Sequence, residues 1–327
     1  MKPTSIIFIA IALIIIFVGG RICAGAEARA EKEGIDIFGQ TLDDENNSVY
    51  KFTFGADNVY NKIELVLDEA DVYIYGGFSE PYMELYNFDD GSYAMTTTNR
   101  NITVNTSFDI MSIVKFWESG FSFDGLRGYL KETEKTETVM PKRVDIYLPT
   151  DGDVNVINVT LDKGSLHVSN LDTAIDFSVN LGEGDAVFTS VNTSSYIKSD
   201  IKKGDLYLNG VTAGTMTATM TEGDVNAENF NFKNISITGV KTNVSVTTSN
   251  TLDFFDTYLS ARQGKITLNG EDRGTEYDSK YSSANDATVI ITVTDGNIIM
   301  AQAEAKPEPA PDSGSDTSGA TDGANTQ

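Results

Sequence analysis

The sequence contains very few of the residues that metal sites and hydrolases usually depend on. Among its 327 residues there is one cysteine, Cys23, and one histidine, His167. A single cysteine excludes an intrachain disulfide and a cysteine-based metal cluster. A zinc or iron site ordinarily needs several histidine or cysteine ligands, and a nucleophile usually needs a histidine base. We expect His167 to face outward instead, because it occupies the polar middle position of a predicted strand.

Basic residues are also scarce, since 24 lysines and arginines stand against 48 aspartates and glutamates. The resulting formal net charge of -24 makes nucleic acid and anionic lipid headgroups poor partners, because both would be repelled. An extracytoplasmic medium rich in cations is the more natural setting. Segments with helical periodicity are nearly absent, and the run Gly182–Glu183–Gly184 predicts a strand turn rather than a phosphate-binding loop. No cofactor is therefore expected.

What the sequence does contain is a repeat between residues 157 and 268. Most side chains two and four residues after each turn position are apolar, and the residue between them is mostly polar, as in a strand with one buried face. The same parity appears seven, five and three residues before it. Each copy therefore predicts a strand, a tight turn, a second strand and a second turn. The six turn positions recur every 19 to 22 residues, at Gly164, Gly184, Gly204, Gly223, Thr242 and Gly264.

A unit of about 20 residues with two short strands matches one coil of a β-solenoid. Coils stacked at the strand spacing of about 4.8 Å would place the apolar positions above one another in a continuous core. Turns this short could also close hairpins, so the pairing of successive strands stays open. We prefer the solenoid because the apolar positions keep their phase between copies. The predicted fold is an all-β, single-domain, β-solenoid-like stack.

The same template occurs twice more, at residues 63–74 and 289–300, and we expect these outer copies to cap the stack. Together the copies define a folded domain over residues 49–301. A strand over Val144–Pro149 leads into the repeat block. The segment 107–135 interrupts the pattern and carries the only tryptophan, Trp117. It is either an aromatic docking surface or, as we favour, a hydrophobic plug that protects an open end of the core.

The two ends of the chain fall outside this domain. Residues 1–26 predict a signal-anchor or transmembrane segment, with residues 4–24 in the membrane and, as the alternative, cleavage near Ala26 and secretion. Residues 27–48 predict a spacer. Residues 302–327 have no aliphatic side chain larger than alanine, which predicts a disordered acidic tail.

The turns place three aspartates at one equivalent position of successive coils: Asp185, Asp205 and Asp224. Stacked carboxylates repel unless a cation or nearby lysines neutralise them, and hard cations prefer oxygen-rich sites. We therefore consider a calcium site at these three residues. The simpler alternative is that each aspartate bonds its local backbone and satisfies the turn geometry.

The order of these features resembles a known family. A short N-terminal membrane segment precedes Ile63–Glu64–Leu65 and Asp71–Val72–Tyr73–Ile74, followed by Ile146–Tyr147–Leu148–Pro149 and serial Gly-Asp-aliphatic turns. This arrangement is similar to the putative-adhesin or "toast-rack" family of bacterial β-strand-repeat domains of unknown function. The resemblance implies an extracytoplasmic, membrane-tethered domain, with some relatives associated with cell-envelope stress systems. It implies no catalytic residues.

The sequence thus predicts a non-enzymatic protein of the bacterial cell envelope. We expect an adhesive or sensory scaffold, anchored as a single-pass protein with its C-terminal domain outside the cytoplasm, that offers flat sheet faces to a protein or surface partner. One alternative is an accessory of an envelope-stress signalling system that binds a membrane partner through residues 107–135. Another is a polysaccharide-active enzyme, which would need a groove lined by two carboxylates.

Overall fold

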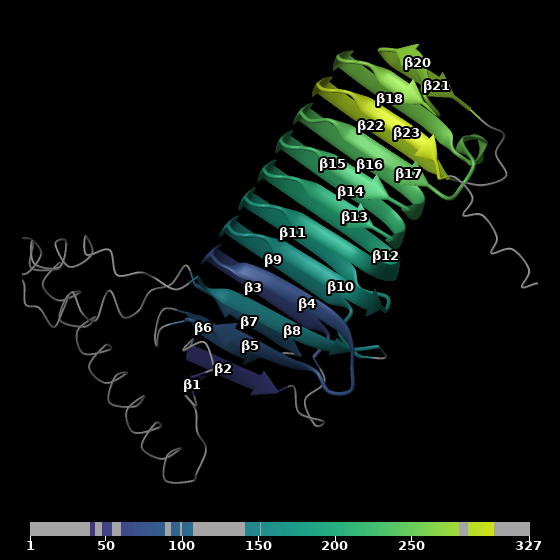
Figure 1. The fold of residues 1–327 in the computed structure, drawn as a ribbon. Helices are drawn as coiled ribbons and strands as arrows, with labels where there is room; N and C mark the ends of the chain where they lie inside the picture. Colours follow the sequence, from purple (N-terminus) through teal and green to yellow (C-terminus); the bar gives the residue numbers. More distant parts are fainter. Residues whose placement is uncertain are drawn as a thin grey trace, which may run out of the picture.

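The computed structural model describes residues 40–42, 48–53, 60–88, 93–98, 100–106, 141–150, 152–280 and 287–303. Within these ranges the chain is all β, apart from the single 3-10 turn η1 (Leu252–Phe254). Figure 1 shows the strands as the rungs of one elongated stack. No helix of the described part is long and apolar enough to cross a membrane. The predicted anchor at residues 4–24, the insertion 107–135 and most of the tail lie outside these ranges.

The strands form two facing sheets. The long strand β12 continues from one sheet into the other, so all the strands belong to one hydrogen-bonded network. In spatial order the first sheet contains β6 (Ala94–Thr98), β7 (Asn101–Asn105), β3 (Lys62–Glu69), β9 (Val156–Lys163), β11 (Asp176–Glu183), the second half of β12 (Ala186–Lys203), β14 (Thr212–Glu222), β16 (Asn231–Lys241), β22 (Thr288–Asp295), β18 (Asp256–Gln263) and β21 (Glu276–Ser279).

The second sheet contains β1 (Gln40–Leu42), β2 (Ser48–Thr53), β5 (Tyr82–Tyr86), β8 (Arg143–Pro149), β4 (Asp71–Phe78), β10 (Leu166–Asp172), the first half of β12, β13 (Leu206–Asn209), β15 (Val225–Glu228), β17 (Val244–Thr248), β23 (Ile298–Gln302), β19 (Ile266–Leu268) and β20 (Glu271–Gly274). The inner strands are parallel, and the pairs toward both ends are antiparallel.

Pairing between coils settles the question that the short turns left open. Val168 pairs with Phe188, and Phe188 pairs with Leu208, so residues about one repeat apart lie directly above one another. The solenoid is therefore confirmed and the hairpin alternative is wrong. The columns of apolar side chains between the sheets are almost completely buried, which is what a unit unable to bury its own face requires.

The predicted order of the coils is wrong at both ends. The copy at residues 63–74 forms β3 and β4 and packs directly on β9 and β10, while β7 and β8 lie beyond it. The copy at residues 289–300 forms β22 and β23 and lies between the coils of β16–β17 and β18–β19. The physical reason is that every copy has the same apolar parity, so each fits against any other.

The described strands also correct the predicted boundaries of the domain. β1 lies inside the range predicted as a spacer and pairs with β2 through Gln40–Leu42. At the other end, Gln302 still belongs to β23, and the backbone N–H of Ala303 donates to the carbonyl of Thr248 at 2.8 Å. Strand pairing, which composition does not reveal, extends the fold at both ends.

The tight turns between the sheets bring successive coils into backbone contact. Gly184 has a φ of +141°, and a Cβ at this residue would lie 2.0 Å from the carbonyl oxygen of Gly164. Thr242 occupies the same turn position with a side chain and without a positive φ. Space for it comes from Gly239, where a Cβ would lie 2.5 Å from the Thr242 Cβ. The larger residue at the turn, Thr242, is thus accommodated by a glycine, Gly239, in the same coil.

Candidate functional site

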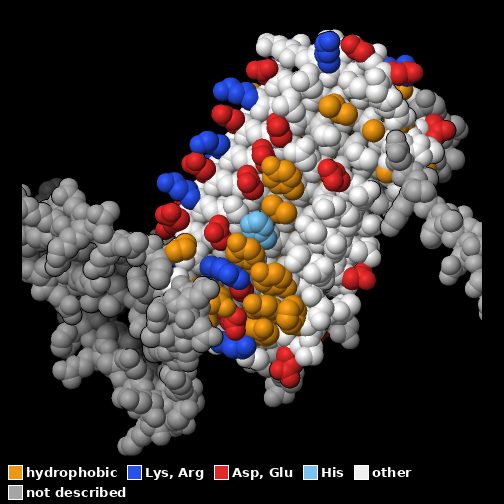
Figure 2. Space-filling view, viewed as in Figure 1, with side chains coloured by type: hydrophobic (Ala, Val, Ile, Leu, Met, Phe, Trp, Pro, Cys, Tyr) orange, Lys and Arg blue, Asp and Glu red, His pale blue; other side chains and the backbone are white. Residues whose placement is uncertain are grey.

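The second sheet carries a concentration of aromatic side chains on its outer side, over β4, β5, β8 and β10. Alternation along these strands buries the apolar residues and turns the intervening ones outward. Tyr73 pairs with Asp145 and with His167, while Tyr147 pairs with Tyr75 and Tyr82. Figure 2 shows these hydrophobic side chains gathered on one part of the face. We call this set the aromatic surface: Tyr73, Tyr75, Phe78, Tyr82, Tyr86, Tyr147 and His167.

The rings of the aromatic surface hold one another in place. Tyr82 stacks on Tyr147 with 4.2 Å between ring centroids, and Tyr75 lies 5.3 Å from Tyr147 on the other side. Tyr73 and His167 stack at 4.7 Å with only 8° between their planes. Because neighbours cover each other's faces, these rings present mainly edges to solvent. Such mutual packing fixes rotamers before any partner arrives and lowers the entropy cost of binding.

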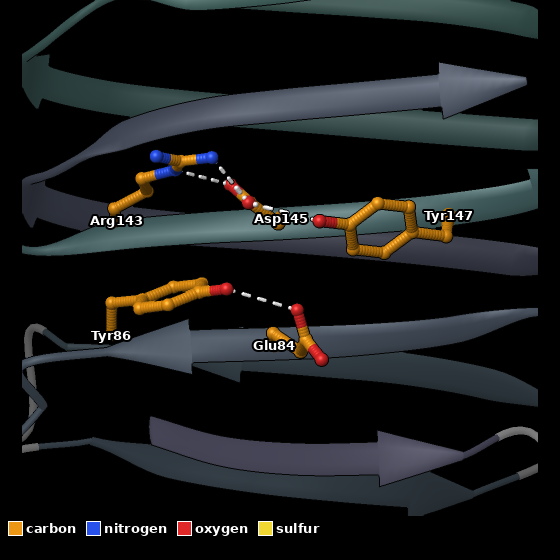
Figure 3. Close-up of polar contacts among 5 residues, drawn as sticks. All are labelled: Glu84, Tyr86, Arg143, Asp145 and Tyr147. Carbon is orange, nitrogen blue, oxygen red and sulfur yellow. Dashed lines mark hydrogen bonds and ion pairs between the residues drawn. The ribbon is translucent and has the colours of Figure 1, made fainter. Parts of the chain in front are cut away.

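An ion pair between a buried aspartate and a partly exposed arginine lies among these rings. The Asp145 side chain is fully buried although it points to the outer side of β8. Arg143 donates from Nε to Oδ1 at 2.6 Å and from Nη2 to Oδ2 at 2.5 Å, and Tyr147 donates its hydroxyl to Oδ2 at 3.3 Å (Figure 3). The Arg143 guanidinium carbon lies 4.5 Å from the Tyr73 ring centroid. The carboxylate therefore positions the arginine among the rings.

Burial dominates the electrostatics of Asp145. It raises the pKa of Asp145, although the hydrogen bonds and charge of Arg143 act to lower it. In return, the hydrogen bonds to Asp145 raise the pKa of Arg143, which stays charged. Burial also raises the pKa of the Tyr147 hydroxyl, with the Asp145 charge as the second cause. Tyr147 thus remains a neutral hydroxyl throughout the physiological range.

A second pair completes the polar part of the surface. Lys51 Nζ lies 3.2 Å from Glu84 Oε1 and 3.7 Å from the centroid of the Tyr82 ring. Tyr86 donates its hydroxyl to Glu84 Oε2 at 3.0 Å (Figure 3), and burial followed by this hydrogen bond raises the pKa of Tyr86. Each of these charges has an opposite partner, so the aromatic surface has no net charge on a strongly acidic chain.

The predicted calcium residues lie elsewhere, in the column of turns between the sheets. Asp185 Oδ1 accepts the backbone N–H of Asp205 at 2.8 Å, Asp205 Oδ1 accepts that of Asp224 at 2.7 Å, and Asp224 Oδ1 accepts that of Asn243 at 3.0 Å. The structure therefore brings the three aspartates into one column, as expected, but directs one oxygen of each to the next coil. Within the described ranges no group of three or more His, Cys, Asp or Glu residues could hold a metal ion. Calcium binding stays a prediction.

Charged residues next to these turns alternate in sign along the stack. Lys203 pairs with Glu183 at 2.7 Å, and Lys241 lies 3.8 Å from Glu222. Figure 2 shows red and blue side chains alternating along this edge. Lysines thus pair with glutamates rather than with the aspartate column, and the hydrogen bond from Lys203 lowers the pKa of Glu183. The alternating positions are Glu69, Lys163, Glu183, Lys203, Glu222, Lys241 and Asp295.

The sequence analysis placed His167 on the outer side of its strand, and the structure confirms this. It missed the aromatic surface as a site. A signal was present, because Tyr73, Tyr75 and Tyr147 occupy polar-parity positions of predicted strands where threonine or serine would suffice. Their convergence depends on β8 lying beside β4, which the order of the sequence does not indicate.

Three solved structures are among those to which this chain is similar. A putative adhesin from Bacteroides fragilis NCTC 9343 is 13% identical, with a TM-score of 0.45 over 78% of this chain and 97% of that one. A putative adhesin from Parabacteroides merdae ATCC 43184 is 12% identical (TM-score 0.38; 79% and 96% covered). A putative lipid binding protein from Parabacteroides distasonis ATCC 8503 is 8% identical (TM-score 0.32; 78% and 97% covered).

No curated protein matches the sequence. The model of the Toastrack family, a domain of unknown function designated DUF4097, matches residues 60–301. This range holds every coil from β3 to β23, together with the aromatic surface. The chain therefore belongs to the Toastrack DUF4097 family.

Proposed function

We propose that this chain is a non-enzymatic binding scaffold of the bacterial cell envelope, and that the aromatic surface is where it meets its partner. The observation that carries the proposal is the combination of locked aromatic rings with internally paired charges. Tyrosine and arginine are enriched in binding hot spots because they supply rigid, amphipathic contact area. Aromatic side chains grouped at a protein surface often mark an interaction site, which favours a binding role for this half-buried set.

The position of the surface in the stack supports an adhesive or sensory role near the membrane. The aromatic surface lies over the strands next to β2, at the end where the described chain begins at Gln40. If residues 4–24 form an anchor, the segment 25–39 can span at most about 50 Å when fully extended. The proposed arrangement is a single-pass protein whose repeat domain stands outside the cytoplasm with this end toward the membrane.

The test is retention of the purified full chain on cell-envelope fragments of the source bacterium. A double variant, Phe78→Ala with Tyr82→Ala, removes two rings of the aromatic surface. Its matched control is Tyr258→Ala with Ile290→Ala, which removes two exposed apolar side chains from the outer side of the first sheet. We expect the first variant to lose retention and the control to keep it.

Thermal unfolding followed by circular dichroism checks that both variants remain folded. Equal retention of the two variants would contradict the proposal. So would retention that disappears only in the control, since the binding face would then be the first sheet. Tyr82→Phe, which keeps the stacked ring, should bind like the unmodified chain.

A further inference from the structure

The aromatic surface continues along the stack as a narrow strip. From His167 the next strands place Val187 and then Tyr207 at the same level of the sheet. Tyr207 is 37% exposed, and its hydroxyl donates to Asp205 Oδ2 at 2.8 Å. Between β5 and β13 lie five strand steps, or roughly 24 Å at the usual strand spacing. The strip is therefore long and only one or two side chains wide.

One position in the strip differs from the rest because an aromatic ring is followed by a small side chain instead of by another ring. Tyr73 covers one face of the His167 ring at 4.7 Å, and the other face points toward the strand that carries the much smaller Val187. Tyr207 follows on the far side of Val187. The two rings are thus separated by two strand spacings, roughly 9–10 Å, with a short aliphatic side chain between them. A gap of this length above Val187 has room for a saturated six-membered ring, whose C–H groups can contact both side chains.

The polar groups of the strip narrow the class of partner. At the Tyr82 end of the strip the charges are paired with each other, as Arg143 is with Asp145 and Lys51 is with Glu84. At the other end the carboxylate of Asp205 accepts the Tyr207 hydroxyl, so the strip offers an anionic polymer no counter-charge. The chain as a whole has a net charge of -24 and repels polyanions. What remains is a set of tyrosine hydroxyls and carboxylates that can exchange hydrogen bonds with hydroxyl groups. Burial raises the pKa of the Tyr75 hydroxyl, which keeps it a neutral donor.

We infer that the strip from Tyr82 to Tyr207 binds an uncharged polysaccharide, with linked pyranose rings lying along the axis of the stack and one ring seated over Val187. The inference rests on the proposed function and names the partner of the same surface. Pyranose rings match this strip because they display C–H groups on their faces and hydroxyls around their rims. A flat strip without a deep pocket suits a polymer that makes several weak contacts rather than one tight one.

The binding test uses the full chain in a polyoxyethylene detergent, because a detergent with a sugar headgroup would compete. The probes are the β-1,4-linked hexasaccharides of glucose and of N-acetylglucosamine, titrated by calorimetry, and insoluble cellulose and chitin in sedimentation. We expect saturable binding to at least one of them. Tyr207→Ala should weaken it about tenfold, as loss of an aromatic hot spot does, and Tyr207→Phe should restore it. Tyr258→Ala, with a 41% exposed ring on the first sheet, is the matched control.

Envelope fragments cover sugars that these probes do not contain. Periodate cleaves the vicinal diols of 1,4-linked glucose, and a chitinase cleaves 1,4-linked N-acetylglucosamine. Treatment of the fragments with both should abolish retention of the chain, whereas protease treatment of the fragments should not. Retention that survives periodate and chitinase but is lost after protease would overturn the inference and leave the proposed function intact, because the partner would then be a protein. Retention that does not depend on the aromatic surface at all would overturn both. Equal weakening of hexasaccharide binding by Tyr207→Ala and Tyr258→Ala would also overturn the inference.

Discussion

Replacing Gly184 by alanine should destabilise the domain far more than an ordinary glycine substitution. The residue has a φ of +141°, where a side chain costs about 1–3 kcal/mol. The new Cβ would also lie 2.0 Å from the Gly164 carbonyl oxygen, so the coils must separate there. Separation weakens the hydrogen bond from the Gly164 N–H to the Glu183 carbonyl, now 3.0 Å, at about 1 kcal/mol. Overpacking by the new Cβ adds about 1 kcal/mol, which brings the expected total to about 3–5 kcal/mol.

Urea unfolding and thermal melting, both followed by far-ultraviolet circular dichroism, measure this loss. For a domain of this size about 4 kcal/mol corresponds to a fall in Tm of about 10 °C. Gly210→Ala is the control, because Gly210 also has a positive φ, +62°, but its nearest atom is 4.0 Å from an added Cβ. The control should lose about 1 kcal/mol. Equal losses in the two variants would refute the close stacking of the coils.

Three further substitutions test contacts within and between coils. Gly239→Ala should cost about 1–3 kcal/mol by overpacking against Thr242, and adding Thr242→Gly should recover most of it in urea unfolding; no recovery would contradict the compensation. Asp205→Ala should lower stability by about 1–2 kcal/mol because the ladder loses an acceptor, whereas Asp205→Asn should be nearly neutral; a Tm that rises with added calcium only when Asp205 is present would favour the cation site instead. Arg143→Met should cost about 2–4 kcal/mol at pH 7 by leaving Asp145 buried without its partner. Without Arg143 the pKa of Asp145 rises further, so protonation at pH 4 should shrink this deficit, and a deficit that grows on acidification would contradict the assignment.

The sequence was sufficient to predict the two-strand unit and to favour the solenoid over the hairpin. Apolar parity around Gly164, Gly184 and Gly204 is a local property of each copy, and stacking buries the apolar face of every copy. The Gly-Asp turns were only partly interpretable. Each aspartate accepts a backbone N–H, as the simpler alternative expected, but not from its own turn. The sequence pattern did not identify the hydrogen-bond donor, because the N–H that each aspartate accepts belongs to the next coil.

The order of the coils could not be predicted for a physical reason. Each copy presents the same alternation to its neighbours, so the energetic difference between neighbours arises from individual side chains rather than from the pattern. The 22-residue step from Thr242 to Gly264, longer than the others, marks the place where β22 and β23 enter the stack. The aromatic surface could not be predicted for the same reason, because it forms only where β8 pairs with both β4 and β5.

The claim that the aromatic surface is the binding face is tested most directly by hydroxyl-radical footprinting of the full chain, free and bound to envelope fragments. Mass spectrometry then reports the oxidation of each tyrosine. The account predicts that Tyr82 and Tyr147 lose reactivity on binding, while Tyr196 and Tyr258, on the outer side of the first sheet, keep theirs. Protection of Tyr196 and Tyr258 with Tyr82 and Tyr147 unchanged would contradict it.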